Sequence, residues 1–158
     1  MASVRVRRIL PGEELAVVRA DHLFDHGRPD PVAVRSYLAD LRNVLLFAFE
    51  GSEALGYLRA TELEQLTTRR KQMFLYEIAV GAASRRHGVG KALVNSLLND
   101  CRERGFEEAF VLTDPANVAA VALYRSTGAI TETPADRMYV YPLHPRLEPS
   151  HQSAPVDR

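Results

Sequence analysis

A strand that leads through a glycine-containing turn into a helix is the feature of this sequence that most limits its fold. The apolar run 73–80, MFLYEIAV, predicts a buried strand, and apolar residues at helical spacing over 89–104 predict a helix that ends at Gly105. Between them stands RRHGVG, residues 85–90, whose small residues let the backbone approach an anion closely. The sequence therefore predicts a phosphate-binding loop at the start of this helix.

Two familiar phosphate loops do not fit the stretch. The loop of nucleoside triphosphatases needs a hydroxyl residue directly after Gly90-Lys91 and a glycine five positions before Gly90, but the sequence has Ala92 and Arg85 there. The dinucleotide-binding fingerprint needs a third glycine at the position of Leu93. Two interpretations remain: a loop that holds a pyrophosphate with first-turn N–H groups and nearby cations, and a plain helix entry with solvent-facing arginines.

The bulk composition narrows the class of protein. With 158 residues, of which 46% are hydrophobic and 25% charged, the chain suits one globular domain with a real core. A formal net charge of zero gives no global electrostatic case for binding nucleic acid or a membrane surface. The single cysteine, Cys101, excludes an internal disulfide framework and a cysteine-based zinc site, and we expect it in the core. No spacing resembles a metal site and the charged N-terminus does not resemble a signal peptide, so the expected location is cytoplasmic.

The remaining elements follow from the period of the apolar residues and from the turn residues between them. Strands are predicted at 3–10, 44–49, 54–61, 109–113, 129–132 and 137–141. Helices are predicted at 13–24, at 30–41 with Asp30 as the N-cap, and at 117–126. Residues 62–71 are polar and predict a loop, and 143–158 predict a loosely ordered, proline-containing tail. The order β-α-α-β-β-β-α-β-α-β-β predicts a mixed α/β fold in one domain, 1–142, and not a doubly wound sheet.

Two motifs at a fixed separation carry a resemblance to a known family. The stretch YEIAVGAASRRHGVGKALVNSLL resembles the central motif of the GCN5-related N-acetyltransferases (GNAT), in which Gln/Arg-x-x-Gly-x-Gly/Ala binds the pyrophosphate of acetyl-CoA; Arg85, Gly88 and Gly90 match it. The stretch DPANVAAVALYRSTGA resembles the next helix of the family, with Asn117 near its start and Tyr124 near its end. The resemblance implies the GNAT fold, a mostly antiparallel twisted sheet with splayed central strands flanked by helices, and acetyl-CoA as the donor.

Within the family, the sequence is similar to the aminoglycoside acetyltransferases that modify the 3-amino group. The similarity rests on YEIAV with RR.G after it, on VALY before Gly128, on DHLF, and on the hairpin NVLLFAFEGSEALGYLRA, and it fades toward the N-terminus. It implies an aminoglycoside as acceptor, direct transfer in a ternary complex, and a homodimer, since two-chain assemblies are frequent among relatives. One departure is Glu77, where aspartate is common in that branch.

The resemblance also implies roles for individual residues. Backbone groups at the end of the central strand would pair with the pantetheine arm, and the loop and the following helices would hold the rest of acetyl-CoA. The implied cofactor-binding residues are Ile78, Ala79, Val80, Arg85, Arg86, His87, Gly88, Val89, Gly90, Lys91, Asn117 and Tyr124. Tyr124 also occupies the position from which the family protonates the departing thiolate. A core tyrosine is the alternative for Tyr124, and an ordinary helix N-cap is compatible with the role of Asn117.

Glu77 is the candidate general base. Acetyl transfer to an amine that is mostly protonated at neutral pH needs a group that takes a proton, directly or through water. A carboxylate in an otherwise apolar strand is costly unless it faces a wet cleft or a partner. Alternation along the strand predicts that Glu77 faces opposite to Tyr76 and Ile78. A surface-facing or structurally paired glutamate is the alternative.

Further carboxylates are candidates for binding a polycationic acceptor. Asp114 follows the strand 109–113, where strand ends line clefts, although a turn residue there is an equal alternative. Asp21, Asp25 and Asp30 lie near the first two helices, which cover the acceptor site in the resembled fold, and a solvated acidic face is the alternative for each. Another amine acceptor (a peptide N-terminus, a lysine or a polyamine) and a non-catalytic acyl-CoA-binding module remain open.

Overall fold

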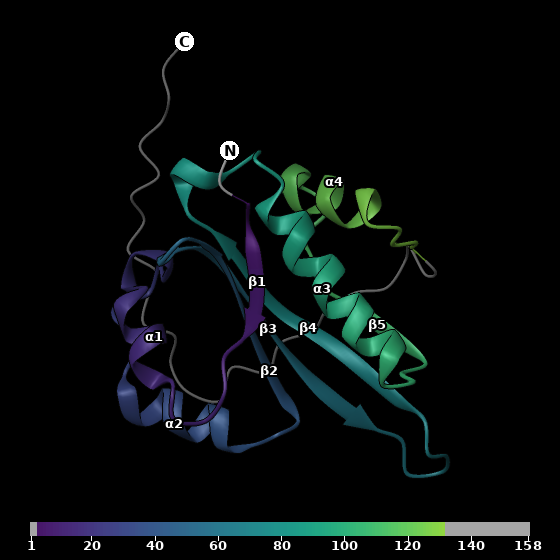
Figure 1. Ribbon diagram of the computed structural model, residues 1–158. Coiled ribbons are helices and arrows are strands. Elements are labelled where there is room, and N and C mark those ends of the chain that lie inside the picture. The colour runs from purple at the N-terminus through teal and green to yellow at the C-terminus, as the bar shows by residue number, and fades with distance from the viewer. Residues whose placement is uncertain (1–2, 132–158) are drawn as a thin grey trace, which may run out of the picture.

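One five-stranded sheet, with its strands in sequence order, organises the structure (Figure 1). In the computed structural model, which describes residues 3–131, the strands are β1 (Arg5–Arg8), β2 (Asn43–Glu50), β3 (Glu53–Glu64), β4 (Lys71–Val80) and β5 (Glu108–Val111). The helices are α1 (Glu14–Arg19), α2 (Pro31–Ala39), α3 (Val89–Glu103) and α4 (Val118–Ser126), with the 3-10 turns η1 (Asp21–Leu23) and η2 (Ala82–Ser84). Strands β1 to β4 pair antiparallel and β5 pairs parallel with β4, which confirms the predicted mixed, mostly antiparallel sheet.

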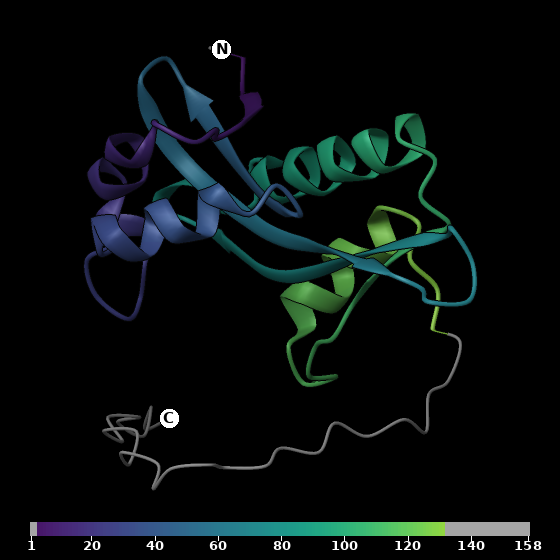
Figure 2. The same cartoon turned by 90° about the horizontal axis from the view of Figure 1, so that it is seen from below.

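Alternating side chains divide the interior into two layers, one on each face of the sheet. In β2, Leu46 and Ala48 pack toward α3, whereas Leu45 and Phe47 pack toward α1 and α2. Figures 1 and 2 show α1 and α2 on one side of the sheet and α3 on the other. Cys101 is buried in the layer under α3, as expected for a core residue. Both faces of the sheet are therefore covered, and any opening for a substrate must lie at a strand edge or at a sheet end.

The N-terminal helical region is broken, so the prediction of one helix over 13–24 is wrong. The α-helix ends at Arg19, and the chain continues as a 3-10 turn. This turn buries Leu23 against the sheet, and Phe24 then stacks on the ring of Tyr57 with a centroid distance of 4.4 Å. The break thus satisfies tertiary packing that the local sequence pattern does not reveal. By contrast, α2 starts as predicted, with the Asp30 carboxylate accepting from the N–H of Val32 at 3.1 Å.

The polar stretch 62–71 is also not a simple loop. Strand β3 continues to Glu64 and β4 already begins at Lys71, so only 65–70 connect them. Glu62 is 6% exposed, and its carboxylate pairs with Arg104 at the end of α3 and with Lys71 at 3.3 Å. Two cations, Arg104 just after α3 and Lys71 at the start of β4, therefore allow an acidic residue inside a strand, where sequence polarity predicted a loop.

Three predicted features near the C-terminus fall wholly or partly outside the described residues. The described part of the expected strand 129–132 has no strand, and the expected strand 137–141 and tail 143–158 lie beyond residue 131. Among residues 3–131, no helix combines the length and apolar composition that a bilayer crossing demands. Within the same residues, no three His, Cys, Asp or Glu side chains gather as a metal site requires.

The buried ion pair of Glu62 generates a stability prediction. We expect Glu62→Ala to lower the free energy of unfolding by about 2 kcal/mol, because it leaves the half-buried Arg104 without its main counter-ion. Glu64→Ala is the matched control, since Glu64 is 65% exposed and pairs loosely with Lys71 at 3.7 Å. The control should lose less than about 0.5 kcal/mol. Urea denaturation of both variants measures the difference, and equal losses would contradict a structural role for the Glu62 pair.

Candidate active site

Strand β4 has one edge that loses its partner halfway along. It pairs with β5 only from Gln72 to Leu75, and within the described residues no strand continues that pairing over 76–80. On the opposite edge, the N–H of Gly81 donates to the carbonyl of Leu55 on β3 at 2.9 Å. Because backbone polar groups alternate in direction along a strand, those of Ile78 and Val80 point away from β3, toward the open side. The side chain of Arg85 donates from that side to the carbonyl of Val80 at 3.2 Å.

A β-bulge in the pairing of β3 with β4 lies directly after the last residue pair between β4 and β5. Arg59 lies opposite Glu77 and Ala60 lies opposite Leu75, so Tyr76 is an extra residue in β4. The predicted alternation is wrong here, because the bulge puts Tyr76 and Glu77 on the same face. The guanidinium of Arg59 shows this directly: it lies over the Tyr76 ring at 4.7 Å and its Nε is 3.3 Å from the Glu77 carboxylate.

The predicted phosphate loop connects the open edge of β4 to α3. Arg86 has a φ of 63° and Gly88 a φ of 80°, two left-handed residues that bring the chain sharply into the helix. Gly88 is the helix N-cap, and its carbonyl accepts the N–H of Ala92 at 2.9 Å. The loop is exposed from Arg85 to Gly88, and the side chain of Lys91 is exposed beside it. Free first-turn N–H groups and a net positive charge thus face solvent together, which is an arrangement that suits a phosphate group.

The two loop glycines have different functions in the fold. A Cβ added at Gly88 would meet no atom within 4 Å, so glycine is required there by the left-handed backbone and not by lack of space. A Cβ at Gly90 would lie 3.3 Å from Leu123 on α4 and 3.7 Å from Val80 on β4. Gly90, which is also predicted to let an anion approach the backbone, therefore has a packing role of its own. Gly90 lets α4 lie directly against the first turn of α3.

Glu77 lies in a network of aromatic and charged side chains on the α1–α2 face of the sheet. The hydroxyl of Tyr57 donates to Oε1 of Glu77 at 2.8 Å, and Nε of Arg59 is 3.3 Å from Oε2. This Nε is buried and makes no hydrogen bond, so the contact is an ion pair only. The guanidinium of Arg59 is also 5.4 Å from the Tyr37 ring centroid. The side chain of Glu77 remains 37% exposed, so it is both partnered and accessible to solvent.

The tyrosines of this network stay protonated donors. Burial, together with the nearby Glu77 carboxylate, raises the pKa of Tyr57 far above its usual value, and burial raises the pKa of Tyr37 to about 12. A protonated Tyr57 fixes the orientation of the carboxylate through its hydroxyl. Sequence reasoning missed Tyr37, Tyr57 and Arg59 because they come from α2 and β3, and only the strand register brings them to Glu77.

Tyr124 lies on the other face of the sheet from Glu77. It is 9% exposed, and with Leu75 and Val111 it lines a cavity of about 200 Å³ at the last residue pair before β4 and β5 separate. Burial raises the pKa of its phenol, which keeps the proton on the hydroxyl at neutral pH. Glu77 and Tyr124 therefore approach the region of strand separation from opposite faces.

The other predicted residues are placed less centrally. Asp114 accepts the N–H of Ala116 at 2.8 Å and Asn117 accepts the N–H of Ala120 at 3.1 Å, so both have the local turn and cap functions named as their alternatives. The carboxylate of Asp21 is exposed and makes no hydrogen bond or ion pair among residues 3–131. Asp25 is exposed but close enough to Tyr57 for its charge to contribute to raising the pKa of that phenol. Of these acids, the charge of Asp25 therefore acts on the tyrosine that donates to Glu77.

Comparison with known proteins identifies the family. The sequence model of the acetyltransferase (GNAT) family matches residues 14–129. Human N-acetyltransferase 8 is 31% identical over 94 residues, which cover 60% of this chain and 41% of that protein. The chain thus spans well under half the length of this curated relative.

Solved structures with the same fold include two acetyltransferases from uncultured soil metagenomic samples. One, an aminoglycoside acetyltransferase with unexplained active-site density, is 28% identical, with a TM-score of 0.72 over 88% of this chain and 99% of that one. Another, an aminoglycoside acetyltransferase in complex with sisomicin, is 23% identical, with a TM-score of 0.76 over 87% and 95% of the two chains. The chain belongs to the GNAT family of acetyltransferases.

Proposed function

We propose that the protein transfers the acetyl group of acetyl-CoA to an amine of an aminoglycoside, with the 3-amino group as the acceptor. The observation that carries this proposal is the position of Glu77, a solvent-accessible carboxylate on the strand whose neighbouring edge is open. A carboxylate there suits an enzyme better than a module that only binds an acyl-CoA, which has no use for a proton acceptor.

The open edge of β4 and the loop after it fit the donor in shape and charge. Acetyl-CoA supplies an activated acetyl group, bound as a thioester to a long polar arm that ends in a pyrophosphate. The outward N–H and C=O groups of Ile78 and Val80 would hydrogen-bond this arm as a further strand would, and an N–H there would polarise a carbonyl. The loop from Arg85 to Lys91 would hold the pyrophosphate through its first-turn N–H groups and its cations.

In the proposed reaction, two residues on opposite faces of the sheet each transfer one proton. Glu77 takes the proton that the attacking amine loses, directly or through a water, as the C–N bond forms. Tyr124 donates its phenolic proton to the sulfur as the C–S bond breaks. One proton is accepted and one is donated, so the two residues return to their starting states by exchange with solvent. Tyr57 acts as a positioning residue, because its hydroxyl holds the Glu77 carboxylate.

The aminoglycoside as acceptor is supported by the neighbours in structure, of which two are aminoglycoside acetyltransferases, and by the acids near Glu77. Asp25 and Glu77 contribute negative charge to the side of the sheet covered by α1 and α2. A polycationic sugar would be attracted by these carboxylates. The similarity of YEIAV and of the RR.G after it to the aminoglycoside acetyltransferases that modify the 3-amino group supports this amine as the acceptor.

A second candidate acceptor is favoured by Arg59. This cation already pairs with Glu77, and its side chain is 36% exposed, so it opposes the approach of a polycation and would attract an anion. An acceptor that carries a carboxylate next to its amine, such as an amino acid or the end of a short peptide, would place the acid on Arg59 and the amine near Glu77. The two candidates predict opposite responses to removal of this charge.

If the loop from Arg85 to Lys91 binds coenzyme A, the substitution Gly88→Ala should weaken that binding. A side chain at a φ of 80° strains the loop by about 1 kcal/mol and displaces its N–H groups, so we expect about tenfold weaker binding of coenzyme A. Gly12→Ala is the matched control, because Gly12 also has a positive φ, of 94°, and free space around the added Cβ, but lies in the turn before α1. Calorimetric titration should find wild-type affinity in the control. The same affinity in both variants would remove the loop from the binding site.

The acceptor is tested by thiol release from acetyl-CoA with sisomicin, spermidine, free amino acids and dipeptides. We expect aminoglycoside turnover to exceed that of the other amines by at least about tenfold in kcat/KM. Burial raises the pKa of Cys101 to about 11, so the protein's own thiol does not interfere with the readout. Mass spectrometry of the product then identifies the acetylated amine.

Glu77→Gln should lower kcat by about a hundredfold and leave the affinity for coenzyme A within twofold, because it removes the proton acceptor and keeps the shape. Glu64→Gln, on an exposed part of the neighbouring strand, is the control. Unchanged turnover in Glu77→Gln would exclude the base role, and turnover confined to amines other than aminoglycosides would overturn the proposed acceptor.

Arg59→Met separates the two candidate acceptors through KM. For a polycationic acceptor we expect KM to fall or stay constant, because a repelling charge is removed; for an amine that carries a carboxylate we expect KM to rise at least about tenfold. Steady-state kinetics with each acceptor measures KM separately from kcat. If Arg59 helps to hold Glu77, kcat should fall with both acceptors. Arg69→Met, in the exposed connection 65–70, should change neither constant.

A further inference from the structure

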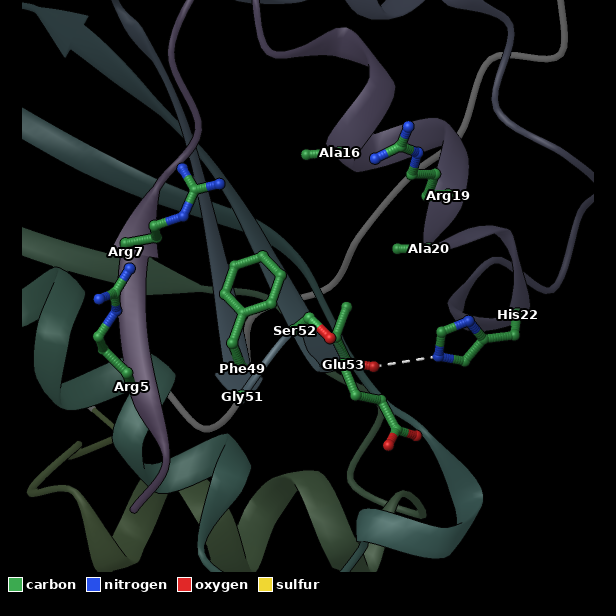
Figure 3. Close-up of a pocket in the computed structure, with 11 residues that line it drawn as sticks. Arg5, Arg7, Ala16, Arg19, Ala20, His22, Phe49, Gly51, Ser52 and Glu53 are labelled. Carbon is green, nitrogen blue, oxygen red and sulfur yellow. Dashed lines mark hydrogen bonds between the residues drawn. The ribbon is translucent and has the colours of Figure 1, made fainter. Parts of the chain in front are cut away.

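A second cavity lies on the α1 side of the molecule, away from the open edge of β4. It has a volume of about 460 Å³ and opens between β1, α1 and the hairpin of β2 and β3 (Figure 3). The charged and polar residues and the aromatic ring that line it are Arg5, Arg7, Arg19, His22, Phe49, Ser52 and Glu53. None of them belongs to the glycine loop or to the network around Glu77.

Three arginines give this cavity a concentrated positive charge. Figure 3 shows Arg7 and Arg19 reaching toward each other from β1 and α1 on opposite sides of the opening, with Arg5 beside Arg7. Among residues 3–131, Arg7 pairs with Glu13 at 2.8 Å, while Arg5 and Arg19 form no ion pair. The one acid in the lining, Glu53, turns its carboxylate away from the three guanidinium groups (Figure 3).

The walls of the cavity are held in place by contacts of their own. The Arg7 guanidinium lies 5.1 Å from the centroid of the Phe49 ring, in addition to its pair with Glu13. Nε2 of His22 donates to the carbonyl of Ala54 at 3.0 Å, which fixes the imidazole against the start of β3. Because Arg7 is already ordered by these contacts, its guanidinium loses less entropy when an anion binds.

We propose that this cavity binds a small molecule with two or more anionic groups, phosphate or carboxylate. Guanidinium groups on two facing walls require at least two acidic groups for full neutralisation, because each bonds one phosphate or carboxylate as a fork. The Phe49 ring and the methyl groups of Ala16 and Ala20 leave room for an apolar part between the charges. The ligand would join α1 to β1 and to the β2–β3 hairpin at once.

The short helical turn η1 connects this cavity to the side of the sheet on which Glu77 lies. Arg19 ends α1, and η1 follows directly. Within η1, Leu23 contacts the end of β4, where a Cβ on Gly81 would lie 3.3 Å from its Cδ2. The next residue, Phe24, stacks on Tyr57, which donates to Glu77. The anion site is therefore separate from the acetyl-transfer residues but shares a rigid segment with them.

The experiment titrates pyrophosphate and, separately, citrate into the full chain by calorimetry, with coenzyme A present in excess to occupy the glycine loop. We expect saturable binding of at least one of the two, weakened by added salt because the contacts are ionic. Arg19→Gln should weaken it about tenfold, and Arg5→Gln combined with Arg19→Gln should abolish it. Arg69→Gln, which removes one exposed charge elsewhere, should leave it within twofold.

The two probes distinguish the chemistry of the ligand. Binding of pyrophosphate alone assigns phosphate, and binding of citrate alone assigns carboxylate. Failure of both to bind at millimolar concentration would overturn the proposal, as would binding that Arg19→Gln leaves unchanged. Because Arg19 is remote from the glycine loop, its effect identifies this cavity even if coenzyme A does not bind, so the proposal fails or holds independently of acetyl transfer.

Discussion

The separation of β4 from β5 after four paired residues is the constraint on which the rest of the structure depends. A backbone edge inside a sheet normally has its hydrogen bonds satisfied by a neighbouring strand, and an edge left open must be satisfied by something else. The outward groups of Ile78 and the N–H of Val80 have this need, whereas the Val80 carbonyl accepts from Arg85, and the glycine loop begins five residues after Val80. A long polar ligand that carries a pyrophosphate, as proposed for acetyl-CoA, would meet both requirements at once.

Charge balance on the α1–α2 face sets the chemistry that this edge can support. Glu77 is held by a neutral donor, Tyr57, and by a cation, Arg59, which itself contacts the rings of Tyr37 and Tyr76. The carboxylate is therefore positioned before any acceptor arrives. The same arrangement means that the acceptor does not meet an isolated negative charge. In the proposed reaction its affinity would depend on how it competes with Arg59, and for this reason a substitution of Arg59 would distinguish the candidate substrates better than a substitution of any acid.

The sequence predicted the elements whose patterns are local. Strand β4 was expected at 73–80 and begins at Lys71, and α3 was expected at 89–104 and ends at Glu103. The glycine loop and the opposed candidates Glu77 and Tyr124 were likewise accessible, through motif spacing. Errors arose where distant residues decide the outcome. The 3-10 turn depends on the packing of Leu23 and Phe24.

The same explanation holds for the strand extension and for the partners of Glu77. Glu62 lies inside β3 because Arg104, more than forty positions later in the chain, neutralises it. The identity of Arg59 as the partner of Glu77 depends on the register of β3 and β4, and that register contains a bulge that alternation alone does not reveal. Local patterns thus identified the candidate residues Glu77 and Tyr124, while the partners of Glu77 required the tertiary structure.

The bulge at Tyr76 has one more consequence. On either side of it the pairing with β3 is regular, so the extra residue could be deleted without disturbing either Leu75 opposite Ala60 or Glu77 opposite Arg59. Such a deletion would leave an uninterrupted ladder, and it would remove the local twist by which β4 turns away from β5. In this chain the surplus residue stands directly after the last β4–β5 pair, so the number of residues in β4, and not only its side chains, bears on where that pairing ends.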